Sequence, residues 1–166
     1  MQENIYDYEK IKEDLRKQVY GLADNKAERI CIFGAGRRGL KLYKELYARF
    51  INIDYFCDNN QSVIGNKVDD IEIIPFNELV KYKENTLVII SVADYVDIEK
   101  QLIDNNFLYV STMNEIQKMY SDIPPVKWLE EFNGESDFTN ECTVRLVKKF
   151  QKLILDICEY YEKYNN

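Results

Sequence analysis

The sequence predicts an α/β protein with a doubly wound parallel sheet, an N-terminal helix and a C-terminal helical extension. Short β-branched runs alternate with amphipathic segments, a glycine-rich turn follows the first run, and the pattern becomes all-helical after residue 121. Alternation of strands and helices is typical of parallel sheets whose helices cross over both faces. We therefore expect an N-terminal helix within 1–28, the α/β domain within 29–120, and the extension within 121–166.

Composition limits the class of protein. The chain has 166 residues, of which 46% are hydrophobic and 31% charged, so it fits one ordinary globular domain with an appendage. A net charge of -7 argues against the broad basic surface that sequence-independent nucleic-acid binding requires. The charged N-terminus lacks the apolar stretch of a signal peptide, and no apolar run approaches the ~20 residues of a membrane span. A cytoplasmic protein without a nucleic-acid partner is expected.

The first segments predict helix, strand, turn, helix and strand. From 4 to 20, apolar residues recur every three or four positions, which indicates a helix that packs on the following domain. Arg29–Phe33 is a short β-branched and aromatic run that ends at glycine, and 38–50 has helical spacing. A second strand is expected at 52–57, and the polar cluster 58–61 ends it. These segments make one βαβ unit.

The remaining elements continue the alternation. Thr86–Val92 is the most hydrophobic stretch of the chain and suits a central strand that is covered on both faces. Thr112 and Glu115 have the spacing of a capping box, which predicts a helix from there to Tyr120. The other expected elements are strands at 71–74 and 107–110 and helices at 76–82 and 94–105.

A glycine-rich turn joins the first strand to its helix. Gly34–Gly39 reads GAGRRG, which fits the pattern GxGxxG, and Asp58 follows Gly39 by 19 residues at the end of the second strand. Placement between strand and helix, with an acidic residue at this distance, is a signature of dinucleotide binding. Gly34 permits a tight turn, Gly36 lets the backbone approach a pyrophosphate, and Gly39 lets the helix pack closely. The sequence therefore predicts a Rossmann-type nucleotide-binding domain.

Side chains around the turn bear on the choice of ligand. Asp58 would accept hydrogen bonds from ribose hydroxyls and repel a 2′-phosphate, which favours NAD over NADP. Ala35, Arg37 and Arg38 fill the variable positions of the turn, and a guanidinium there could clamp a diphosphate, including that of a nucleotide-sugar. The alternative for each arginine is a solvated surface charge. Methyltransferases that bind S-adenosylmethionine also place a glycine-rich turn here, but the glycine spacing matches the dinucleotide form more closely.

Four runs resemble Rossmann-like domains of bacterial surface-polysaccharide biosynthesis: ICIFGAGRRGLKL, IDYFCDNNQSVIGNKV, IPFNEL and VIISVADY. Similar segments form the nucleotide-binding part of nucleotide-sugar dehydratases and epimerases. They also form the N-terminal domain of sugar acetyltransferases and the C-terminal domain of sugar C-methyltransferases. The likeness covers about residues 29–110. It implies a nucleotide-binding domain that acts in this kind of pathway.

The resemblance also implies further ligand contacts. Asn59 would stand beside Asp58 at the nucleotide, and the loop from Ser91 to Tyr95 would lie next to the ligand, which would be NAD or a nucleotide-sugar. The chain departs from these families because it lacks acetyltransferase hexapeptide repeats, the dehydratase Tyr-x-x-x-Lys pair and a methyltransferase catalytic domain. The resemblance therefore implies a binding module, either accessory or part of a larger enzyme.

No residue is assigned a catalytic role from the sequence. The chain has no histidine, which removes the commonest general base and the Ser-His and Cys-His nucleophile systems. Its four cysteines are far apart and form no CxxC pair, so no metal site is expected. Three alternatives to the binding module stay open. The first is a small NAD-dependent oxidoreductase or nucleotide-sugar-modifying enzyme that uses Tyr95 or a neighbouring residue. The second is a methyltransferase-related domain that binds S-adenosylmethionine, and the third is an interaction protein.

The C-terminal extension carries an apolar seam at helical spacing between about 139 and 164. A stripe of this kind must be buried. It could pack against its own domain, or it could pair with another subunit in a homodimer or with a partner domain. The seam consists of Val147, Phe150, Ile154, Ile157 and Tyr161.

Overall fold

The computed structural model describes residues 8–121. The chain divides into two compact units, Met1–Ile123 and Pro124–Asn166, and every element described below belongs to the first. The beginning of the expected first helix and the C-terminal seam lie outside the described residues, as do Cys142 and Cys158.

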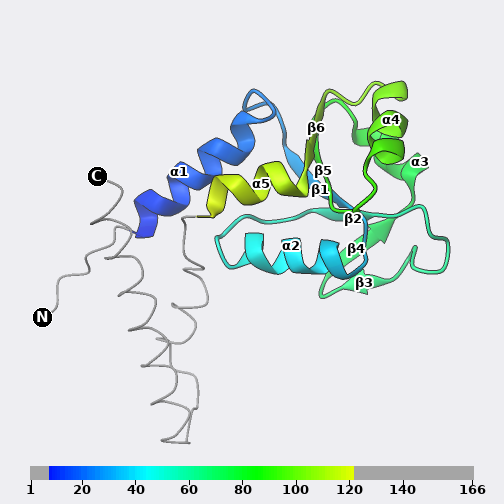
Figure 1. Ribbon diagram of the computed structural model, residues 1–166, viewed down its shortest axis with the longest axis horizontal. Helices are drawn as coiled ribbons and strands as arrows, with labels where there is room; N and C mark the ends of the chain where they lie inside the picture. Colours follow the sequence, from blue (N-terminus) through cyan, green and yellow to red (C-terminus); the bar gives the residue numbers. More distant parts are fainter. Residues whose placement is uncertain (1–7, 122–166) are drawn as a thin grey trace, which may run out of the picture. The chain divides into compact units, whose positions relative to one another are not determined.

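A six-stranded sheet forms the centre of the first unit (Figure 1). Its strand order is β3-β4-β2-β1-β5-β6, with β3 antiparallel to β4 and all other neighbours parallel. The chain moves outward from β1 to one side and then returns to its other side, so the sheet is doubly wound and the predicted fold class is confirmed. The strands are β1 (Arg29–Phe33), β2 (Tyr55–Cys57), β3 (Lys67–Val68), β4 (Ile71–Ile74), β5 (Thr86–Ile90) and β6 (Tyr109–Thr112).

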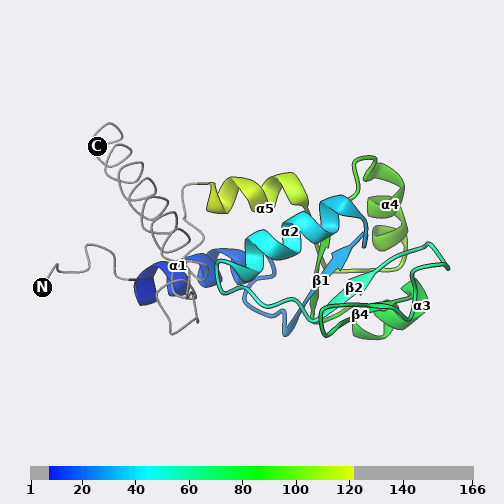
Figure 2. The same ribbon diagram turned by 90° about the horizontal axis from the view of Figure 1, so that it is seen from below.

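Helices cover both faces of this sheet (Figure 2). One face packs against α1 (Tyr8–Gly21), α2 (Arg37–Tyr47) and α5 (Met113–Tyr120). The other packs against α3 (Phe76–Leu79), the 3-10 helix η1 (Val80–Tyr82) and α4 (Val96–Asp104). Because side chains alternate along a strand, β1 directs Ile30 and Ile32 to the first face and Cys31 and Phe33 to the second.

The two central strands are buried along almost their whole length. Every residue of β5 is buried, as the continuous apolar run predicts for a strand with helices on both faces. Cys31 and Cys57 are buried free thiols that pack as small apolar side chains. Burial raises the pKa of the Cys57 thiol to about 12, with a smaller contribution from the nearby Asp58 carboxylate.

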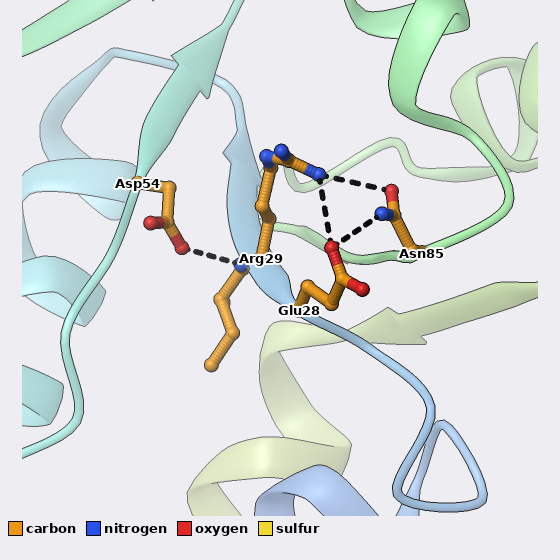
Figure 3. Close-up of polar contacts among 5 residues, drawn as sticks. Glu28, Arg29, Asp54 and Asn85 are labelled. Carbon is orange, nitrogen blue, oxygen red and sulfur yellow. Dashed lines mark hydrogen bonds and ion pairs between the residues drawn. The ribbon is translucent and has the colours of Figure 1, made fainter.

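Polar side chains hold the amino ends of the central strands together (Figure 3). An Arg29 Nη1 donates to Asn85 Oδ1 at 3.1 Å, and Asn85 Nδ2 donates to Glu28 Oε2 at 2.8 Å. Beside them, Asp54 Oδ2 accepts a hydrogen bond from the backbone N–H of Ile30 at 2.8 Å. These contacts lie at the amino ends of the strands, opposite the glycine turn. They fasten the sheet there and leave the carboxyl ends of the strands for the site.

Some elements differ from the sequence prediction. Helix α2 ends at Tyr47, before the expected boundary, and Phe50 has a φ of 62° that no helix residue adopts. Strand β6 is shifted two residues toward the C-terminus, to Tyr109–Thr112. The structure also adds β3, which pairs with β4 through a tight turn at Asp69 and Asp70 and was not predicted. A strand of two residues has no periodicity from which to predict it.

Tyr43 joins α2 to the β3–β4 hairpin. Its hydroxyl donates to Asp69 Oδ2 at 2.8 Å, and its ring, which is 7% exposed, meets the ring of Phe56 edge-on. Burial, with the hydrogen bond to Asp69 as the next cause, raises the pKa of Tyr43 to about 12. The folded state therefore keeps this proton at pH values where the unfolded chain has lost it.

This shift predicts a pH dependence of stability. Tyr43 contributes stability that is fully present below its ordinary pKa of 10.0 and is lost as the pH rises toward 12. Tyr43→Phe should lower the free energy of unfolding at neutral pH by ~1 kcal/mol, because one hydrogen bond is lost. Denaturant titrations should show that the free energy of unfolding falls less steeply between pH 10 and about 12 in the variant than in wild type. Parallel curves would contradict this assignment, and Tyr95→Phe serves as the control because Tyr95 is 39% exposed.

Candidate functional site

The glycine turn lies at the switch point of the sheet, at the carboxyl end of β1. Strand β1 pairs with β2 on one side and with β5 on the other. The N–H of Gly34 donates to the carbonyl of Cys57 at 2.8 Å, and the N–H of Ser91 donates to the carbonyl of Phe33 at 2.9 Å. The turn is therefore fastened to the ends of both neighbouring strands. In open α/β sheets, ligands bind in the crevice at this position.

Two glycines of the turn are required by close packing. Gly34 has a φ of 109°, and a β-carbon there would lie 2.6 Å from Ser91 Oγ. A β-carbon on Gly39 would lie 1.8 Å from the carbonyl oxygen of Gly34. No other residue can stand at either position without a shift of the backbone or of its neighbours. This contact brings the first turn of α2 against the end of β1.

The start of α2 is open to solvent. Gly36 is its N-cap residue and is exposed, with an ordinary φ of -82°. A β-carbon on Gly36 would meet nothing within 4 Å, and no side chain caps the helix. The first N–H groups of a helix have no partner within it, and its dipole adds partial positive charge. The turn therefore offers N–H donors and free space to an anion.

Asp58 lies at the turn, as the sequence predicts, and it has structural contacts there. Its Oδ2 accepts from the N–H of Ala35 at 2.8 Å, and its Oδ1 accepts from the N–H of Asn60 at 2.8 Å. An ionised carboxylate has about four acceptor positions, so both oxygens can accept further bonds. The neighbouring Asn59 pairs with Gln101 of α4, its Nδ2 donating to Gln101 Oε1 at 2.9 Å. Gln101 was not predicted, since its helix position carries no signal for a contact this distant in sequence.

The other predicted site residues differ in exposure and in whether their polar groups are free to contact a ligand. Arg37 and Arg38 are both exposed, and Arg38 Nε donates to the carbonyl of Ser91 at 2.7 Å. Ser91 itself is 1% exposed, and its hydroxyl lies 3.0 Å from the carbonyl oxygens of Phe33 and Gly34. Ser91 thus positions the turn and does not offer its hydroxyl to a ligand. Tyr95 is 39% exposed and lies in the loop after the carboxyl end of β5, directly before α4.

Two further properties of the described residues bear on function. Within residues 8–121, no cluster of carboxylate and thiol side chains has the arrangement that a metal ion needs. Among the helices of the same part of the chain, none is both long enough and apolar enough to span a bilayer.

The fold and the turn define a Rossmann-type α/β domain. The chain belongs to the C2185-like, N-terminal family, whose model matches residues 25–116, more than half of its length. That span contains the whole turn, Asp58 and the loop from Ser91 to Tyr95. No curated protein matches the sequence.

Solved structures resemble the chain at low identity. The UDP-D-quinovosamine 4-dehydrogenase of Vibrio fischeri is 16% identical with a TM-score of 0.43, and the match covers 60% of this chain and 89% of that one. RSP, a Rex-family repressor, is 14% identical with a TM-score of 0.41, and 64% of each chain is covered. RSP in complex with β-NADH matches at 14% identity and a TM-score of 0.42, covering 73% of this chain and 70% of that one.

The packing of the turn predicts effects of very different size on stability for two glycines. Gly39→Ala should lower the free energy of unfolding by ~3 kcal/mol or more, because overpacking here meets backbone and not a flexible side chain. Gly36→Ala should change it by less than ~1 kcal/mol, since the added methyl group has open space and an allowed φ. Denaturant unfolding of both variants tests this contrast. Equal losses of stability would contradict the close contact of Gly39 with Gly34.

Proposed function

We propose that this domain binds the pyrophosphate of NAD or of a nucleotide-sugar at the Gly34–Gly39 turn. The observation that carries this proposal is the uncapped start of α2, where Gly36 leaves open space in front of the first N–H groups. The domain then acts as a binding module in bacterial glycan or surface-polysaccharide biosynthesis, on its own or within a larger enzyme. The resemblance of the four sequence runs supports this pathway.

Local charge favours a diphosphate at this position. The chain carries a net charge of -7, but the two variable positions of the turn hold Arg37 and Arg38. Arg38 is held through its Nε by the carbonyl of Ser91, which fixes the stem of the side chain. Its two terminal nitrogens keep N–H donors in the fork geometry that matches phosphate oxygens. Positive groups near a site govern anion binding more than the total charge does.

Asp58 supports a ribose next to the pyrophosphate. Its carboxylate is held beside the turn by the N–H groups of Ala35 and Asn60, and acceptor positions remain for ribose hydroxyls. A 2′-phosphate at this place would be repelled by the carboxylate, so NAD is favoured over NADP.

A thermal-shift screen identifies the ligand class. The panel contains NAD, NADP, S-adenosylmethionine and UDP-, GDP- and CDP-sugars. A ligand that binds the folded state raises the unfolding temperature by mass action. We expect a shift with NAD or with a nucleotide-sugar. Stabilisation by S-adenosylmethionine alone would contradict the proposal and would favour a methyltransferase-related domain.

Gly36→Val tests the turn as the binding site. The branched side chain would occupy the space that the pyrophosphate needs, so the best ligand of the screen should lose all measurable binding in calorimetry. The substitution should leave the fold intact, because a β-carbon on Gly36 meets nothing within 4 Å. Wild-type affinity in a folded variant would show that the ligand binds elsewhere.

Asp58→Ala tests the ribose contact. Loss of charged hydrogen bonds should weaken binding by ~1.5–3 kcal/mol, which is at least about tenfold in the dissociation constant. The variant also removes the acceptor for Ala35 and Asn60, so its stability without ligand must be measured too. Asp54→Ala is the matched control. Asp54 accepts from the Ile30 N–H at the same 2.8 Å, but it lies at the opposite, amino end of the strands. Equal affinities of the Asp58 and Asp54 variants would exclude a ribose contact.

A further inference from the structure

A pair of side-chain carboxamides links the two halves of the sheet beside the glycine turn. Asn59 Nδ2 donates to Gln101 Oε1 at 2.9 Å, and Gln101 Nε2 donates back to Asn59 Oδ1 at 3.4 Å. Asn59 follows β2, and Gln101 belongs to α4, the helix that follows β5. Strand β1 lies between β2 and β5 in the sheet. The pair therefore joins elements from both sides of the strand that carries the turn.

Each carboxamide keeps hydrogen-bonding capacity after the pair has formed. A carboxamide has two N–H donors and an oxygen with two acceptor positions, and the pair uses one donor and one acceptor position of each. Asn59 is exposed and Gln101 is partly exposed, so the remaining groups lie at the surface of the part of the chain that the structure describes. A hydrogen bond between side chains that water can reach adds little net stability. The main effect of the pair is to hold two amide groups in fixed positions next to Asp58.

We propose that Gln101, paired with Asn59, selects the base of the bound nucleotide and that this base is adenine. The inference rests on the proposed function, in which Asp58 accepts from the hydroxyls of a ribose. A ribose carries its base on the carbon atom next to the one that bears the 2′-hydroxyl. The base of a ribose bound at Asp58 therefore comes close to the next residue, Asn59, and to its partner Gln101.

The chemistry of the pair favours adenine over the other bases. Asn and Gln side chains match adenine, which offers an amino donor beside a ring-nitrogen acceptor, whereas guanine is matched by Arg or Lys and the cytosine amino group by a carboxylate. Uracil has no amino group to donate to an amide oxygen. Both members of the pair are neutral carboxamides. The pair thus narrows the proposed ligand from NAD or a nucleotide-sugar to NAD.

A change of base in the ligand, combined with a change at Gln101, tests this inference. Calorimetry measures the affinity of the full chain for NAD and for the analogue in which hypoxanthine replaces adenine, because hypoxanthine has a carbonyl oxygen in place of the amino group. Wild type should bind NAD at least about tenfold more tightly than the analogue. Gln101→Leu should weaken NAD binding by about the same factor and leave the affinity for the analogue nearly unchanged. A purely structural role of Gln101 would lower both affinities together.

Gln18→Leu is the matched control. It makes the same change at an exposed position of α1, which packs on the opposite face of the sheet from α4, and it should keep the preference for NAD. The fold should tolerate Gln101→Leu, because Gln101 is partly exposed and leucine favours helix. Thermal unfolding of both variants without ligand checks this.

The outcomes separate this inference from the proposed function. Equal binding of NAD and its analogue by wild type, a Gln101→Leu variant that keeps the preference, or tighter binding of a UDP-, GDP- or CDP-sugar than of NAD overturns the inference. Each of these results leaves pyrophosphate binding at the turn in place. A wild-type chain that binds none of the nucleotides overturns the proposed function, and the selection of adenine with it.

Discussion

The contact between Gly39 and the carbonyl of Gly34 is the constraint on which the site depends. A β-carbon on Gly39 would lie 1.8 Å from that oxygen, so α2 can begin directly over the end of β1 because this residue has no side chain. The close approach places the first turn of the helix at the switch point of the sheet. With no side-chain cap at Gly36, the N–H groups of that turn face the space above the strands.

The turn is held by groups that come from the ends of two strands and from the first turn of α2. Ser91, after β5, directs its buried hydroxyl at two carbonyls of the turn, and Arg38 is fastened to the Ser91 carbonyl. Asp58, after β2, accepts from the N–H of Ala35. A binding turn that is rigid before the ligand arrives has less entropy to lose on binding. In the proposed function the fold therefore holds the turn in place before a ligand arrives, and the exposed Gly36 and Arg37 would meet that ligand.

Local signals predicted most of the fold. The bounds of β1 were predicted because a β-branched run stands directly before a glycine, and the capping box of α5 was predicted because both of its partners are three residues apart. Strand β3 was missed because two residues carry no period. The second role of Asp58 and the contact of Asn59 with Gln101 were also missed, since the partners are 23 and 42 residues apart. Side-chain pairs of this kind follow from the packed sheet and leave no trace in local spacing.

Chemical-shift mapping by NMR is the most direct test of nucleotide binding at the turn. The titration adds NAD, and in parallel a UDP-sugar, to the labelled full chain and follows the backbone amide resonances. The account predicts that the largest shifts fall on Gly36 and on the first N–H groups of α2, from Arg37 to Gly39, with a smaller shift near Asp58. Saturable shifts confined to other parts of the sheet, or an unchanged spectrum with every nucleotide, would contradict it.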